Sequence, residues 1–77
     1  MELKDTVDLM LSDDYKDRLK AEYYQLQIRC RKISKKLEKL YESEDNCCLH
    51  ILEEQYMAMV KYRAILIQRL YSEEIEL

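Results

Sequence analysis

Apolar residues recur every three or four positions along two long stretches of the chain, which is the spacing of one face of an α-helix. In the first stretch they are Tyr15, Leu19, Tyr23, Leu26, Cys30, Ile33, Leu37 and Leu40. In the second they are Leu49, Leu52, Tyr56, Met59, Leu66 and Leu70, with Arg63 at one position of the same series. Alternating steps of three and four are typical of a coiled-coil seam. The pattern predicts two helices, one over about 13–42 and one over about 47–74.

The segment between the two helices, SEDN at 43–46, is polar and favours a turn. A connection this short makes two long helices antiparallel neighbours. We therefore predict a coiled-coil-like helical hairpin over residues 12–77. Ser12 is the expected N-cap of its first helix, followed by Asp13 and Asp14 in the first turn.

A shorter apolar-periodic piece, residues 1–11, precedes the hairpin and predicts one or two turns of helix. The chain has no glycine and no proline, so the usual helix breakers are missing. The predicted fold class is all-α.

With 77 residues the chain can bury only a small core, and domains of this size usually need a disulfide framework, a metal or a partner chain. Three cysteines, two of them adjacent (Cys47 and Cys48), do not suggest a secreted disulfide framework. The start MELKDTVDLML lacks a signal-peptide layout, and no apolar run reaches membrane-spanning length. We expect a cytoplasmic homo-oligomer.

The two flanks of the predicted hairpin differ in chemistry. One flank is apolar and is the expected oligomer interface, formed by Tyr24, Met57, Val60, Ala64, Ile67 and Tyr71. The other is mixed and carries Arg18, Glu22, Gln25, Arg29, Gln55, Ala58, Tyr62 and Arg69. Arginines around an aromatic side chain, with amide groups nearby, suit a phosphate and a stacked base. The alternative is a solvated flank with Arg–Glu pairs between the helices.

The net charge of −3 conceals a basic block at residues 29–39. An acidic protein is a poor nonspecific binder of nucleic acid. The block could hold a small anionic ligand, or Lys35 and Lys36 could pair with Glu53 and Glu54 across the hairpin. Glu22 and Arg63 could form a further pair at or beside the seam.

No catalytic constellation is recognisable in the chain. The single histidine, His50, follows Cys47 and Cys48, but adjacent cysteines do not readily reach one tetrahedral ion together. No Gly-rich phosphate loop or Ser/His/Asp set is present. We expect no metal, no cofactor and no enzymatic activity, and we read Cys30 as a small core residue.

The stretches DYKDRLKAEYYQLQIRCRKI (14–33) and LEEQYMAMVKYRAILIQR (52–69), with the ending EIEL, resemble a family of small bacteriophage proteins. That family is labelled as related to an open reading frame of a crAss-like phage. Its pattern matches Asp14, Tyr15, Arg18, Lys20, Glu22, Tyr23, Leu26 and Arg29 in the first helix. In the second helix it matches Leu52, Gln55, Ala58, Met59, Tyr62, Leu66 and Arg69. The chain departs from the family in its shorter connection without Gly or Pro, in lacking a C-terminal glycine, and in its first dozen residues.

The resemblance implies a helical hairpin from a phage but no stated activity. Small oligomeric helical hairpins of phages include sponges that sequester nucleotide immune signals, such as cyclic oligonucleotides or cyclic ADP-ribose derivatives. Our hypothesis is therefore a non-enzymatic anti-defence protein that binds such a signal on the mixed flank. The alternative is a small protein–protein interaction module or inhibitor that acts through its apolar face.

Overall fold

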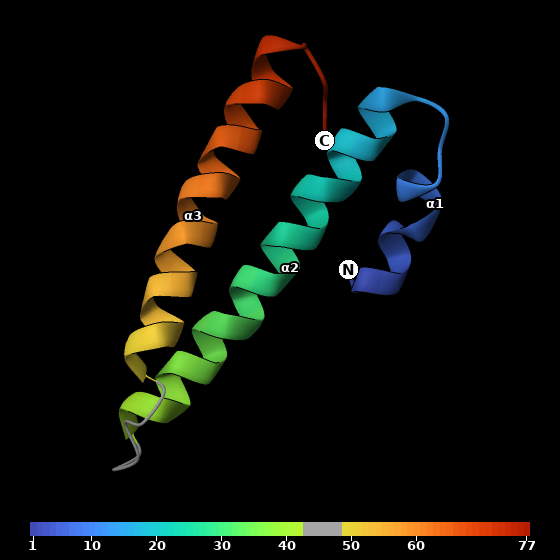
Figure 1. The fold of residues 1–77 in the computed structure, drawn as a ribbon. Coiled ribbons are helices and arrows are strands. Elements are labelled where there is room, and N and C mark those ends of the chain that lie inside the picture. Colours follow the sequence, from blue (N-terminus) through green and yellow to red (C-terminus); the bar gives the residue numbers. More distant parts are fainter. Residues whose placement is uncertain (43–48) are drawn as a thin grey trace.

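A computed structural model describes residues 1–42 and 49–77 of the chain, and every regular element in this part is helical. The 3₁₀-helix η1 (Leu3–Thr6) leads into α1 (Val7–Met10), and the two long helices are α2 (Tyr15–Glu42) and α3 (Leu49–Ser72). The long helices run antiparallel, side by side, and the N-terminal segment lies along α2 on the side away from α3 (Figure 1). The prediction of an all-helical fold with two long packed helices is confirmed. The predicted turn at 43–46 lies outside the described residues.

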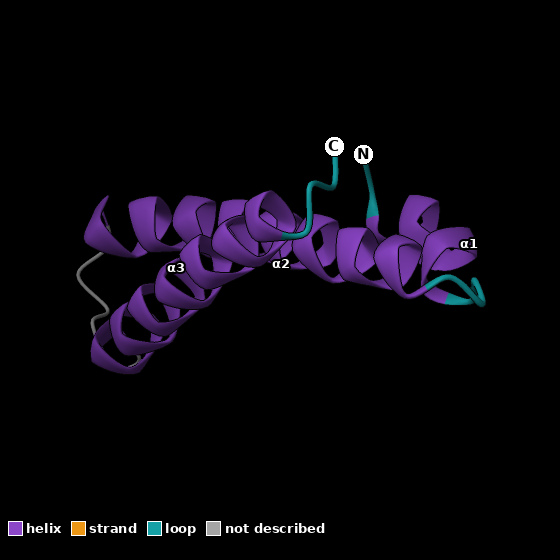
Figure 2. Ribbon diagram, turned by 90° about the horizontal axis from the view of Figure 1, so that it is seen from above, coloured by secondary structure: helices purple, strands orange, loops and turns teal. Residues whose placement is uncertain are grey.

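The two long helices cross at an angle rather than lying strictly parallel (Figure 2). The molecule is correspondingly elongated, with extents of 47 × 25 × 15 Å. Side chains near the crossing are buried between the helices, and the flanks on either side open into shallow depressions. None of the described helices is long and apolar enough to span a membrane.

The first long helix is capped by Asp14 and not, as we expected, by Ser12. The Asp14 carboxylate accepts a hydrogen bond from the backbone N–H of Lys16 at 3.0 Å. The Ser12 hydroxyl accepts from the backbone N–H of Asp14 and donates to the Asp17 carboxylate. Because α2 begins at Tyr15, Asp14 is the residue placed to accept from the free first-turn N–H groups. The hydrogen bonds of Ser12 stabilise the segment just before the helix.

The last turn of α3 closes in a Schellman-type motif built without glycine. The backbone N–H of Ile75 bonds to the carbonyl of Leu70 at 2.9 Å, and that of Glu74 bonds to the carbonyl of Tyr71. Glu74 has φ of 57°, in the left-handed region that favours glycine. The motif folds Ile75 back onto the core beside Leu70. The C-terminal residues therefore cover one end of the hairpin.

We predict that Glu74→Gly stabilises the protein by about 1 kcal/mol, because it relieves the cost of the left-handed backbone while keeping both capping hydrogen bonds. Thermal unfolding followed by circular dichroism should show a melting temperature higher by roughly 4–8 °C. Glu73→Gly is the matched control: Glu73 has no positive φ, so the same change there should give no gain. Equal stabilisation by both variants would contradict the prediction.

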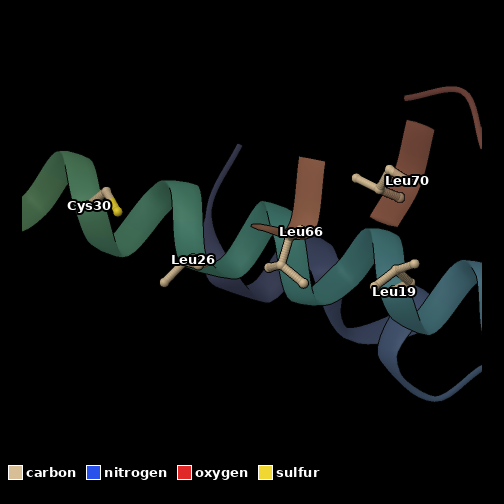
Figure 3. Close-up of a cluster of buried hydrophobic side chains, with 5 residues drawn as sticks. All are labelled: Leu19, Leu26, Cys30, Leu66 and Leu70. Carbon is tan, nitrogen blue, oxygen red and sulfur yellow. The ribbon is translucent and has the colours of Figure 1, made fainter. Parts of the chain in front are cut away.

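The core lies where α2 and α3 cross. It consists of Leu19, Leu26 and Cys30 of α2 with Leu66 and Leu70 of α3 (Figure 3). Four partly buried side chains pack against this cluster: Tyr23, Tyr56, Met59 and Ile75. All except Ile75 belong to the predicted seam. Cys30 is buried and not disulfide-bonded, as expected for a small core residue.

A second buried layer, which the seam pattern did not identify, lies between α2 and the N-terminal segment. Ala21 and Ile28 of α2 are buried although they lie away from the α3 seam. Thr6 is also buried, and its hydroxyl donates to the carbonyl of Leu3 at 2.7 Å. The spacing of seven residues between Ala21 and Ile28 puts both on one helix face, and this spacing was the available signal. The N-terminal segment thus packs on its own hairpin.

Candidate functional site

Four of the predicted ligand-binding residues line one depression on the mixed flank of the hairpin. Its lining is Glu22, Gln25, Leu26 and Arg29 from α2 with Tyr62 from α3, and its volume is about 150 Å³. Residues far apart in the sequence line this depression together because α2 and α3 run antiparallel, side by side (Figure 1). These four residues, predicted to share one side of the hairpin, thus line one depression, and their role in binding a ligand stays a prediction.

A larger depression adjoins the first and shares Leu26 and Arg29 with it. It is lined by Leu26, Arg29, Lys32, Ile33, Gln55 and Met59, with a volume of about 350 Å³. Gln55 was among the predicted ligand residues, whereas Lys32 was not, although it lies one turn beyond Arg29 on the same helix face. Two cationic groups and an amide therefore surround an apolar floor of Leu26, Ile33 and Met59. We call the two depressions together the Arg29 groove.

Arg29 occupies the junction of the two depressions and is exposed. No ion pair or side-chain hydrogen bond joins it to another residue of the described chain. Its guanidinium has five N–H donors in a planar fork, which suits a carboxylate or phosphate. Tyr62 supplies an aromatic surface within the same lining. Such a combination can hold a phosphate and stack on a ring.

Gln25 connects the groove to the N-terminal segment. Its amide N–H group donates to the Thr6 hydroxyl at 2.9 Å and lies 3.4 Å from the sulfur of Met10. Because Thr6 is buried, this contact fixes the Gln25 side chain along one wall of the groove. Residues 1–11 therefore position a groove residue, a role that the sequence did not indicate.

The other three predicted ligand residues line neither depression. The guanidinium of Arg18 donates to the carbonyl of Ser12 at 2.8 Å, which ties it to the start of α2. Arg69 donates to the Tyr15 hydroxyl. Ala58 is exposed on α3. The three arginines thus do not converge on a single point, because two of them bond to groups near the start of α2.

The surroundings of Arg69 favour the protonated form of its guanidinium. The hydrogen bond to Tyr15 is the main factor that raises the pKa of Arg69, and the nearby carboxylates of Glu22 and Glu73 raise it further. Glu22, which lines the groove, is therefore also close enough to Arg69 to favour its charged form. The Glu22 carboxylate lowers the positive potential of the smaller depression, whereas the lining of the larger one contains Arg29 and Lys32 and no carboxylate.

The basic block does not pair with α3 in the way we considered. Within residues 1–42 and 49–77, Lys35 and Lys36 form no ion pair, and Glu53 instead accepts a hydrogen bond from the Tyr41 hydroxyl. That bond is the main factor that raises the pKa of Tyr41. Glu54 pairs with His50 one turn earlier on α3, at 3.3 Å. Among the described residues, Lys35 and Lys36 therefore do not pair with Glu53 and Glu54 across the hairpin.

His50 lies on the surface at the start of α3, as expected, and its neighbours Cys47 and Cys48 lie outside the described residues. No group of three metal-ligating side chains gathers among the residues that the structure describes.

The apolar flank of α3 is largely uncovered. Met57 is 72% exposed, Tyr71 is 85% exposed and Ile67 is 46% exposed, while Val60 is half-buried. Tyr24, also half-buried, packs edge-on against Tyr23 with 5.8 Å between ring centroids. Only two residues of α3, Leu66 and Leu70, are buried. One hairpin alone therefore leaves most of the apolar surface of α3 in water.

Comparison with known proteins gives one match. Residues 13–72 match the Sequestin family, and this range includes both long helices and every residue of the Arg29 groove. No curated protein and no solved structure shows significant similarity to the chain. The first dozen residues, for which the sequence resemblance found no counterpart, also fall outside the match. Because the match spans more than half of its length, the chain belongs to the Sequestin family.

Proposed function

We propose that this protein binds and sequesters a nucleotide-derived immune signalling molecule, and that it does so for a bacteriophage in the cytoplasm of its host. The observation that carries the proposal is the Arg29 groove, in which two cations, an aromatic ring, amide groups and one carboxylate, Glu22, surround an apolar floor. The family name is compatible with a sequestering role. Sequestration requires tight binding and a high copy number, and no chemical step.

Each part of the groove suits one part of a nucleotide. Arg29 and Lys32 would hold a phosphate, because both are cationic and lie one turn apart on α2. Tyr62 would stack on a base or ribose at the other end. Gln25 and Gln55 would bond to polar edges of the ligand, and the Thr6 contact holds Gln25 ready for this. Arg18 and Arg69 bond to groups near the start of α2. They would contribute only to the positive electrostatic potential around the groove.

We also propose that the protein is a homo-oligomer, assembled through the apolar flank of α3. A chain of 77 residues has little core of its own, and the exposed side chains Met57, Ile67 and Tyr71 form one stripe on α3. The stripe of a second copy would cover this stripe, so that the same surface of both copies forms the contact. The Arg29 groove lies on the other flank and would stay open to ligand.

Ile67→Asp should convert the oligomer to a monomer of 9.4 kDa, because a carboxylate would have to be buried in an apolar contact. We expect the dissociation constant of the assembly to rise by about 100-fold or more, which light scattering after size exclusion would measure. Ile65→Asp is the control, since it makes the same change at a residue with the same 46% exposure, which lies two positions from Ile67 and therefore on a different face of α3. A monomeric wild-type protein, or equal dissociation by both variants, would contradict the proposed interface.

A capture-and-release assay tests the sequestering function. A candidate signal is mixed with excess protein and passed through a membrane that retains the protein; the retained fraction is then heated, and the released compound is analysed by chromatography. The proposal expects the compound to be retained and then recovered unchanged. Recovery of a chemically altered compound would mean that the protein is an enzyme. Free passage of every cyclic dinucleotide, cyclic trinucleotide and ADP-ribose derivative would contradict the proposal.

A further inference from the structure

A third depression lies on the opposite flank of the hairpin from the Arg29 groove. It has a volume of about 270 Å³ and is lined by Cys30, Arg31, Ser34, Lys35, Glu38, Tyr56 and Arg63. None of these residues lines the Arg29 groove, and none belongs to the stripe of Met57, Ile67 and Tyr71 that we propose as the oligomer contact. Because the linings share no residue, the third depression and the Arg29 groove are distinct surfaces of the same hairpin.

Arg63 is the unusual member of this lining. It occupies a position of the α3 seam that is otherwise apolar, and it is half-buried there. The partner that we considered for it, Glu22, lines the depression on the other flank, and no ion pair or hydrogen bond joins Arg63 to another described residue. A partly buried cation that forms no ion pair is costly. Some anion at this position would offset that cost.

The charges around Arg63 favour an anion strongly. Arg31, Lys35 and Arg63 contribute three positive charges, and Glu38 contributes one negative charge, so the lining carries 3 − 1 = +2. Glu38 forms no ion pair with any of the three cations. It therefore lowers the local potential without occupying the guanidinium of Arg63. A divalent anion would balance the site.

We propose that this depression, the Arg63 site, binds a phosphate group, as a second anion site separate from the Arg29 groove. The guanidinium of Arg63 can bond to two phosphate oxygens, and Arg31 and Lys35 can neutralise the remaining charge. The Ser34 hydroxyl adds a donor, and Tyr56 forms an apolar wall. The inference stands on these residues and does not depend on the proposed sequestering function.

Titration with pyrophosphate by calorimetry at low ionic strength tests the site, with Arg63→Met as the main variant. Methionine fills a similar length with an apolar side chain, so the seam should tolerate it, and circular dichroism would check the fold. We expect affinity at one of two sites to fall at least tenfold. Lys61→Met, a neighbouring exposed cation on α3 that lines none of the three depressions, should change affinity less than twofold.

Two further variants separate the Arg63 site from the Arg29 groove. Arg29→Met should leave one pyrophosphate bound, and adding Arg63→Met to it should abolish binding. Arg63→Lys keeps the charge and should retain part of the affinity, which covers the case in which Arg63→Met does not fold.

Three results would overturn the proposal. The first is unchanged binding by Arg63→Met, and the second is an equal loss in Lys61→Met, which would mean a nonspecific charge effect. The third is a fall in oligomer mass in Arg63→Met with pyrophosphate affinity unchanged. In that case a carboxylate of a second copy, and not a phosphate, would be the partner of Arg63.

Discussion

Leu66→Ala should lower the free energy of unfolding by about 3 kcal/mol, the largest stability loss that we expect from a single substitution. Leu66 is 0% exposed and lies in the centre of the cluster where α3 crosses α2. Truncation would leave a cavity that two helices alone cannot easily close. The melting temperature should fall by roughly 12–24 °C in a thermal unfolding experiment.

The loss is large relative to what so small a chain can have. A domain of 77 residues has a total stability of roughly 4–12 kcal/mol. Leu11→Ala is the matched control, because the same atoms are removed from a side chain that is 72% exposed. A change below about 0.5 kcal/mol is expected there. Similar losses in both variants would mean that the core does not lie at the helix crossing.

Arg29→Glu should weaken binding of the nucleotide signal by about 100-fold or more, the largest functional effect that we expect. The substitution removes hydrogen bonds to a charged group and puts a carboxylate where both depressions meet. Stability should barely change, because Arg29 is exposed and has no partner in the described chain. Calorimetric titration with the signal, alongside a melting curve, would measure both quantities.

Lys39→Glu is the control for Arg29→Glu. It reverses one charge on the same helix, at an exposed position that lines neither part of the groove. We expect less than a threefold effect on affinity. Equal losses of affinity in the two variants would mean that binding depends on the overall positive charge of α2 and not on the groove. A different outcome is that Arg29→Glu binds the signal as well as the wild type does. If the protein then lost its anti-defence activity only when the stripe on α3 was altered, the alternative of a protein-interaction module would be favoured.

The long helices could be predicted because their seam obeys a simple spacing over many residues. Leu19, Leu26, Leu66 and Leu70 were placed on the seam and are buried in the cluster. Tyr15, at the first position of the same pattern, is nevertheless 45% exposed. Spacing fixes which face of a helix turns inward, but the crossing angle decides how far along that face the burial extends.

The packing of the first residues could not be predicted in the same way. A short apolar piece has several surfaces available to it, and the choice depends on tertiary contacts. The pairing of Thr6 with Gln25 settles that choice, yet it joins residues 19 positions apart that carry no common motif. The cap at Asp14 shows a similar limit, since three successive residues with capping side chains compete for one role.

The candidate site was predictable in part. The antiparallel pairing placed Glu22, Arg29 and Tyr62 on one flank, and these residues do line one depression. The bonds of Arg18 to Ser12 and of Arg69 to Tyr15 were not predictable, because long side chains choose partners that depend on local backbone geometry. Lys32 was part of the predicted basic block at 29–39 but was not chosen as a ligand residue, although it lines the groove with Arg29.

A thermal-shift screen tests the central claim, nucleotide binding in the Arg29 groove, most directly. Wild-type protein and Arg29→Glu would each be melted with cyclic dinucleotides, cyclic trinucleotides and ADP-ribose derivatives. A ligand at 100 times its Kd adds about 2.7 kcal/mol of stability, which corresponds to a shift of roughly 10–20 °C in so small a domain. We predict such a shift for one class of compound in the wild type and a shift of at most roughly 2–3 °C in Arg29→Glu, whose affinity is expected to be about 100-fold lower. No shift across the panel, or the same shift in both proteins, would contradict the account.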